Sequence, residues 1–228
     1  MAGYLDEFAL FARLRAASGD AWRAYVDHEF VARLADGSLP EACFRHYLGQ
    51  DYLFLIHFAR AYGLAVYKAD TLADMRAAAG GLSAILDTEM ALHVEYCHGW
   101  GLDEAAMAAL PEATSTMAYT RYVLEAGMQG DLLDLEVALA PCILGYGEIG
   151  ARLAADPETK RDGNPYGAWV DMYAGAEYQD IARAHAAALD RLWTARAGEG
   201  RFAGLTRTFG QATRLEAAFW QMGLDRAA

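Results

Sequence analysis

Apolar residues recur along this chain at intervals of three and four, the spacing that places them on one face of an α-helix. Strands leave a different pattern, and no stretch alternates valine, isoleucine or threonine with polar residues between turn dipeptides. Several helical segments are apolar around most of their circumference, as expected for central members of a bundle. The pattern therefore predicts an all-α protein.

Turn residues divide this pattern into helices. Pro40 begins a long helix, Gly99 ends another, and Gly80-Gly81 is a weak point within the latter. The polar segment 156–165 carries the main loop signal, but no linker, repeat or low-complexity tract divides the chain. Residues 1–228 are therefore expected to form a single domain, a helical bundle. The predicted helices span residues 20–34, 40–68, 72–98, 111–127, 131–153, 166–173, 176–197 and 204–224.

Composition and charge limit the classes of function. The 228 residues are 55% hydrophobic and 22% charged, which excludes intrinsic disorder and suits a chain that folds without disulfides or metals. Lys+Arg total 19 against 31 Asp+Glu, a formal net charge of −12, and the basic residues form no run. Because an acidic surface repels phosphate backbones and anionic lipid, we expect neither nucleic acid nor a membrane as a partner.

The cysteines and the N-terminal residues indicate the compartment. The chain has three cysteines, Cys43, Cys97 and Cys142, and no two of them form a Cys-x-x-Cys pair. Because the number is odd and this spacing is absent, neither a disulfide framework nor a zinc site is expected. The first residues carry acids where a signal peptide carries bases, and no run of 18 apolar residues occurs. These features predict a cytoplasmic, reduced protein.

The long helix after Pro40 carries one carboxylate within an aromatic stripe. A carboxylate among aromatic rings pays a desolvation cost unless a partner compensates it. Asp51 is therefore either paired with a tyrosine hydroxyl or an arginine of a neighbouring helix, or an acceptor for a small polar ligand; spacing alone leaves both open. The stripe consists of Tyr47, Asp51, Phe54, Phe58 and Tyr62.

A proline and a cysteine stand together inside another predicted helix. Pro141 removes a backbone hydrogen bond there, at a cost of roughly 3 kcal/mol, and is tolerated more readily where the kink shapes a site. Cys142 follows at once, Tyr146 lies one turn on, and nearby glycines permit close approach. Most buried cysteines are small hydrophobic residues, which is our interpretation of Cys43 and Cys97, whereas Cys142 is a candidate nucleophile.

A second acid faces aromatic residues near the C-terminus. Glu216, Phe219 and Trp220 share one helical face, a setting that raises a carboxyl pKa and suits proton transfer; the alternative is a carboxylate at the edge of an apolar stripe. Tyrosine hydroxyls can also line a pocket for a heterocycle. The pair Glu95 and His98 is one Glu-x-x-His, too little for a di-iron bundle, so no metal site is expected.

Five segments, taken together, resemble the TenA family, or thiaminase II, whose fold is of the haem-oxygenase-like helical type. The resemblance runs over nearly the whole chain. The segments that carry it are Gln50-Asp51-Tyr52-Leu53-Phe54, Ala118-Tyr119-Thr120-x-Tyr122, Pro141-Cys142-x-x-Gly145-Tyr146-x-Glu148-Ile149-Gly150, Tyr166-x-x-Trp169-x-x-x-Tyr173 and Glu216-x-x-Phe219-Trp220.

The resemblance implies a hydrolase of thiamin salvage. Its substrate would be 4-amino-5-aminomethyl-2-methylpyrimidine and, less efficiently, thiamin, with no metal or organic cofactor and typically in a homotetramer. Cys142 matches the nucleophile, Asp51 the acid that anchors the aminopyrimidine, and Glu216 the carboxylate that moves protons. The residues that match the pocket lining are Phe54, Tyr119, Tyr146, Tyr166 and Phe219.

One position departs from the family pattern, and two alternatives stay open. Phe54 stands where many relatives have tyrosine, so a hydroxyl contact is missing and ring specificity is open, whereas the presence of Cys142 favours the cysteine-dependent branch. The first alternative is an oxidase or binding protein of the same fold, like the relative that completes a quinone cofactor. The second is a non-enzymatic regulator, which the net charge and the lack of a basic patch disfavour.

Overall fold

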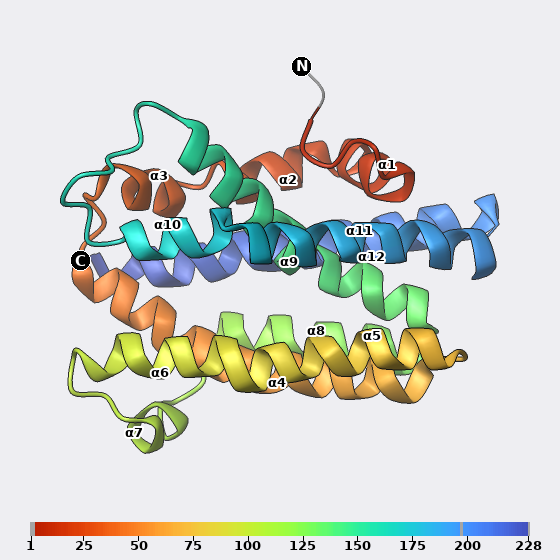
Figure 1. Ribbon diagram of the computed structural model, residues 1–228, viewed down its shortest axis with the longest axis horizontal. Helices are drawn as coiled ribbons and strands as arrows, with labels where there is room; N and C mark the ends of the chain where they lie inside the picture. The colour runs from red at the N-terminus through yellow and green to blue at the C-terminus, as the bar shows by residue number, and fades with distance from the viewer. Residues whose placement is uncertain (1–2, 197, 228) are drawn as a thin grey trace. The chain divides into compact units, whose positions relative to one another are not determined.

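The computed structural model describes residues 3–196 and 198–227, and every regular element within them is helical (Figure 1). The predicted all-α class is confirmed. In chain order the elements are α1 (Ala9–Ala17), α2 (Gly19–Val26), α3 (Glu29–Asp36), α4 (Glu41–Lys68), α5 (Leu72–Ser83), the π-helix η1 (Ala84–Glu89), α6 (Met90–His98), α7 (Glu104–Ala108), α8 (Thr114–Gln129), α9 (Leu132–Ala155), α10 (Gly167–Ala174), α11 (Ala176–Arg196), α12 (Glu199–Leu224) and the 3-10 helix η2 (Asp225–Ala227).

One predicted helix near the N-terminus is corrected. The single helix expected over residues 20–34 is wrong, because the chain breaks between α2 and α3. His28 has an extended backbone there, and its Nδ1 accepts a hydrogen bond from the N–H of Phe30 at 3.1 Å. A histidine at a helix N-cap is less common than Ser, Thr, Asp or Asn, so the start of α3 was not recognised. The short helices α1 and α7 were not predicted either.

The helical run from residue 72 to residue 98 contains an irregular turn, although not where the glycines stand. Gly80 and Gly81 lie inside regular α5, and the π-turn η1 follows at residues 84–89. Gly81 is required for packing instead, since a Cβ there would lie 2.3 Å from Cε1 of Tyr62. The sequence predicted a weak point in the helix at these glycines. The structure instead has a regular helix there, and Gly81 lets α5 lie close to α4.

The chain groups into two compact units. Unit 1 combines Met1–Leu39 with Glu136–Gln221, and unit 2 combines Pro40–Leu135 with Met222–Ala228. The expectation of a single domain over residues 1–228 stays a prediction. Within the described residues, no helix has both the length and the apolar character that a membrane crossing requires.

Unit 2 is built around α4. The helices α5 and α8 pack along it, and α6, α7 and η1 contact it as well (Figure 1). One α4 residue holds the start of α8: Gln50 accepts hydrogen bonds through Oε1 from the N–H of Ala113 and the hydroxyl of Thr116, each at 2.8 Å. Its Nε2 donates to the carbonyl of Pro111 at 3.0 Å. Gln50 thus fixes the start of α8 against α4.

Unit 1 encloses a cluster of aromatic rings. Tyr146 of α9 lies 4.8 Å from Tyr173 and 5.2 Å from Trp220, measured between ring centroids. Trp220 in turn stacks on Phe30 at 4.9 Å, and Trp169 lies 4.5 Å from Tyr173. The cluster joins α3, α9, α10 and α12, since each helix contributes a buried ring. Aromatic pairs at these distances stabilise a core beyond their area of burial.

Candidate functional site

Asp51 is buried in α4, and its carboxylate has two polar partners in unit 2. The Tyr47 hydroxyl donates to Oδ2 at 3.2 Å, and His93 of α6 lies with Nε2 2.7 Å from the same oxygen. Only 7% of the Asp51 side chain and 3% of the His93 side chain are exposed. The sequence left open whether Asp51 pairs with a tyrosine hydroxyl or an arginine, or accepts a hydrogen bond from a ligand. The structure shows the pairing with a tyrosine, and the partner from the neighbouring helix is a histidine and not an arginine.

Both ring nitrogens of His93 face acceptors. Nδ1 lies 2.9 Å from the backbone carbonyl of Glu89, and Nε2 faces Asp51. A histidine that donates from both nitrogens is positively charged. Burial by itself lowers the pKa of His93, but the hydrogen bond and the charge of Asp51, together with Glu89, outweigh burial and raise this pKa to about 8. His93 therefore balances the buried charge of Asp51 at neutral pH.

Glu89 completes this group at the end of η1. Burial raises the pKa of Glu89 to about 7; the charge of His93 opposes this rise and the charge of Asp51 adds to it. The sequence showed Glu89 and His93 one helical turn apart, but it gave no sign that His93 faces Asp51. That contact depends on how α6 packs on α4, which local spacing does not encode.

Two predicted lining residues lie on α4 and α8. Phe54 and Tyr119 are buried, with their ring centroids 5.0 Å apart, and Phe58 extends the stack on α4 at 5.2 Å from Phe54. Phe54 is one turn after Asp51, so the two share a face of α4. Unit 2 therefore brings together three predicted site residues, an acid and two aromatic rings.

The predicted nucleophile belongs to unit 1. Cys142 is half-buried in α9, directly after Pro141, which the helix accommodates in its interior. The Tyr25 hydroxyl donates to the carbonyl of Pro141 at 3.3 Å. A Cβ at Gly145 would lie 2.1 Å from Cε1 of Tyr25, so only glycine lets this ring approach. Gly145 thus permits the close approach of the Tyr25 ring one turn after Pro141, and the role of Cys142 stays a prediction.

The second predicted acid lies on α12. Glu216 and Phe219 are each 2% exposed, and the neighbouring Trp220 packs against Tyr146 of α9. Tyr146 itself is one turn after Cys142. The ring contact between Tyr146 and Trp220 thus brings together the two helices that carry Cys142 and Glu216.

Tyr166 has a different environment from the one expected of a pocket residue. It stands at the N-cap of α10, and its hydroxyl donates to the backbone carbonyl of Leu39. Its own N–H donates to Oδ1 of Asn164 at 2.9 Å. The hydroxyl therefore fixes the loop before α10, and a role for Tyr166 in lining the pocket stays a prediction.

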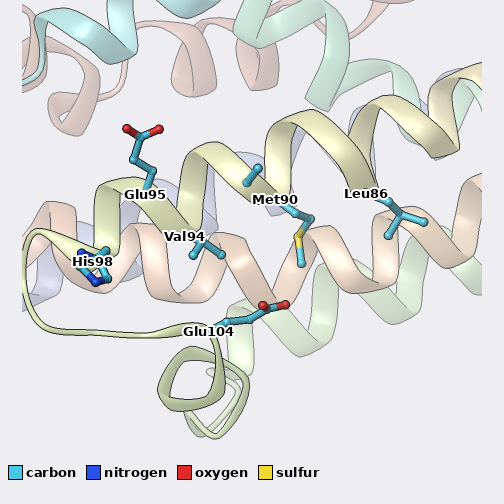
Figure 2. Close-up of a pocket in the computed structure, with 7 residues that line it drawn as sticks. Leu86, Met90, Val94, Glu95, His98 and Glu104 are labelled. Atoms are coloured by element: carbon cyan, nitrogen blue, oxygen red, sulfur yellow. The ribbon is translucent and has the colours of Figure 1, made fainter.

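A surface hollow lies elsewhere in unit 2. It encloses about 450 Å³ between α6, η1 and α7, and Figure 2 shows Met90 and Val94 pointing toward Glu104, whereas Glu95 points away from them. The Tyr52 hydroxyl donates to Glu104 at 3.3 Å. None of the predicted catalytic or binding residues lines this hollow. Its lining consists of Leu86, Met90, Ala91, Val94, Glu95, His98 and Glu104.

The described residues contain no group of three or more His, Cys, Asp or Glu side chains placed to hold a metal ion. Glu95 and His98, the single Glu-x-x-His of the sequence, lie at the surface hollow. The remaining two cysteines are buried: Cys43 lies 3.6 Å from the carbonyl of Leu224, and burial raises the pKa of Cys97 to about 11. A thiol with such a pKa is a poor nucleophile at neutral pH.

Comparison with solved structures identifies the fold. A TenA family transcription regulator from Silicibacter sp. TM1040 superposes with a TM-score of 0.89 and 48% identity, over 94% of this chain and 96% of that one. A domain of unknown function from Shewanella denitrificans, described as having a heme oxygenase-like fold, superposes at 0.73 with 13% identity, over 95% and 93% of the two chains. The predicted haem-oxygenase-like type is therefore confirmed.

Comparison of sequences leads to the family. An aminopyrimidine aminohydrolase from Halalkalibacterium halodurans is 36% identical over 204 residues, which are 90% of this chain and 90% of that protein. The model of the TENA/THI-4/PQQC family matches residues 15–226. With a match over nearly its whole length, this chain belongs to the TENA/THI-4/PQQC family.

Proposed function

We propose that the protein is an aminopyrimidine aminohydrolase of thiamin salvage, which converts 4-amino-5-aminomethyl-2-methylpyrimidine and water to the 5-hydroxymethyl pyrimidine and ammonia. The observation that carries the proposal is the relative of that name, which aligns over nine-tenths of both chains. The half-buried thiol of Cys142 and the buried carboxylates of Asp51 and Glu216 support it, since they supply a nucleophile and two acids.

In the proposed reaction, Asp51 binds the aminopyrimidine and Cys142 acts as the nucleophile. The thiolate forms a C–S bond at the ring carbon next to the one that bears the aminomethyl group, while a ring nitrogen gains a proton. Breaking the bond to the side-chain nitrogen then releases ammonia and leaves an exocyclic methylene. Water adds to this methylene, and the C–S bond breaks as the ring nitrogen gives up the proton that it gained, so that the ring recovers its aromaticity and Cys142 returns to its starting form.

Glu216 moves protons in this sequence. It delivers one proton to the departing amine and takes one from the attacking water, so its net protonation is unchanged after each turnover. Aromatic rings are a suitable setting for such a group, because they exclude water and favour the neutral acid. Phe54, Tyr119, Tyr146, Tyr166 and Phe219 line the pocket in this proposal.

The experiment that tests the proposal compares two cysteines. We expect the purified protein to release ammonia from the aminomethylpyrimidine and to form the hydroxymethyl product, and we expect Cys142→Ser to reduce the rate by at least about a thousandfold. Cys97→Ser is the matched control, since Cys97 is buried and its thiol has a high pKa. Wild-type rates in Cys142→Ser, or no product from the wild type, would contradict the proposal.

The proposal also covers a second substrate, the cellular location and the assembly of the protein. We propose thiamin as a second, slower substrate, a cytoplasmic location and a homotetrameric assembly. Light scattering of the purified protein would give four times the mass of the 24.8 kDa chain if the assembly is correct. The net charge of −12 supports the expectation that it binds a small molecule and not nucleic acid.

A further inference from the structure

The carboxylate of Asp51 is anchored at one oxygen. The hydrogen bonds from the Tyr47 hydroxyl and from His93 Nε2 both end on Oδ2. A ligand that binds this carboxylate would therefore meet Oδ1. Because both donors come from buried side chains, they restrict rotation of the carboxylate about its χ2 bond and thereby fix the direction of Oδ1.

His93 is itself held on both sides. Its Nδ1 faces the carbonyl of Glu89, so the ring cannot turn away from Asp51 without losing a second hydrogen bond. The titratable groups that act on His93 are Asp51 on α4 and Glu89 on η1. Tyr47 on α4 and Cys97 on α6 interact with Asp51. No cation other than His93 is hydrogen-bonded to Asp51 among the described residues, so the imidazolium supplies the balancing charge.

We infer that His93 is a positioning residue: through its hydrogen bond to Oδ2 it orients Asp51, so that Oδ1 accepts a hydrogen bond from the exocyclic amino group of an aminopyrimidine. This inference rests on the proposed function. His93 touches no reacting atom in this arrangement, so its effect is on substrate binding and thus on KM, with a smaller effect on kcat. The pKa of about 8 implies that KM rises as the pH passes that value and the positive charge is lost.

Two amide variants separate the two hydrogen bonds of the ring. The amide nitrogen of His93→Gln reaches the region of Nε2 and can donate to Asp51, whereas that of His93→Asn reaches only the region of Nδ1 and can donate to Glu89. At pH 7 we expect His93→Asn to raise KM by about tenfold or more, as for loss of a hydrogen bond to a charged group, and His93→Gln to stay within about threefold of wild type.

The pH profile distinguishes positioning from a structural role. Because glutamine does not titrate, we expect His93→Gln to lack the part of the KM rise above pH 8 that wild type shows. Titration of the substrate contributes equally to both proteins and cancels in the comparison. A wild-type KM that is flat between pH 7 and 9, or a His93→Asn variant that is folded and has wild-type KM, would overturn the inference.

A measurement without substrate keeps the test independent of the proposed function. NMR titration of the His93 ring should show its pKa fall well below about 8 in Asp51→Asn, because the largest favourable interaction is gone. An unchanged pKa would refute the pairing itself. If the wild type releases no ammonia, the proposed function fails; if it does and the His93 variants behave as wild type, the inference alone fails.

Discussion

Replacing Gly145 by alanine tests the packing beside the predicted nucleophile. The new methyl group would lie 2.1 Å from Cε1 and 2.7 Å from the hydroxyl oxygen of Tyr25. The Tyr25 ring is fully buried, with Trp22 at 5.7 Å, Trp220 at 6.3 Å and its hydroxyl on the carbonyl of Pro141. Because neighbouring rings occupy the space into which Tyr25 would move, the clash cannot be relieved by a simple rotation.

The expected magnitude follows from two opposing contributions. Overpacking a core usually costs about 1–3 kcal/mol, and a fully buried ring places this site at the upper end. Alanine recovers about 1 kcal/mol relative to glycine in a helix interior. We therefore expect a net loss of about 1–2 kcal/mol in the free energy of unfolding, or about 2–8 °C in Tm for a chain of this size.

Chemical unfolding in urea, followed by far-UV circular dichroism, measures this loss. Gly63→Ala in α4 is the matched control, because its Cβ would have no neighbour within 4 Å and should stabilise the protein by about 0.5–1 kcal/mol. We also expect Gly145→Ala to reduce the ammonia-release rate, since Tyr25 supports the turn that precedes Cys142. Equal stabilisation by both alanines would refute the packing argument.

Two further predictions concern buried polar side chains. Burial lowers the pKa of His185 from 6.5 to about 4 in the folded state, and the carboxylate of Glu136, whose Oε2 lies 3.3 Å from Nδ1, opposes this shift. The stabilising contribution of the neutral ring is therefore present above pH 6.5 and is lost as the pH falls toward 4, by at most about 3 kcal/mol. Urea unfolding at pH 7 and pH 4.5 should show this loss in the wild type and not in His185→Gln; a pH-independent difference between the two proteins would contradict it. The substitution Gln50→Leu should reduce the free energy of unfolding by about 2–4 kcal/mol, because the N–H of Ala113 and the carbonyl of Pro111 lose their hydrogen-bond partner. If urea unfolding shows a loss below about 1 kcal/mol, water has replaced the amide and the argument is wrong.

Helix positions were largely accessible from the sequence because they depend on local signals. The start of α4 after Pro40 and its end at Lys68 match the prediction, and so does the loop that follows α9. The break between α2 and α3 was missed, since it depends on a histidine cap that propensity does not favour. Local chemistry therefore predicted those boundaries that carry proline, glycine or a polar cluster.

The candidate site was accessible only in part. The aromatic stripe on α4 indicated that Asp51 is buried, and burial is confirmed. The identity of its charged partner was not accessible, because His93 is distant in sequence and reaches Asp51 only through the packing of α6. The sequence likewise gave no sign that the Tyr166 hydroxyl donates a hydrogen bond to the backbone carbonyl of Leu39, 127 positions away.

The π-turn η1 has a consequence for the alignment of two antiparallel helices. The run from α5 to α6 touches α4 at two fixed points, Gly81 on Tyr62 and His93 on Asp51. Eleven positions separate the two contacts along α4, but twelve separate them along the opposite run. A π-turn absorbs one surplus residue, which in a regular helix would rotate everything beyond it by about 100°. Deleting one residue from Ala84–Glu89 would therefore restore a regular helix with eleven positions between the contacts and keep His93 facing Asp51, whereas closing the turn into an α-helix without a deletion would turn His93 away.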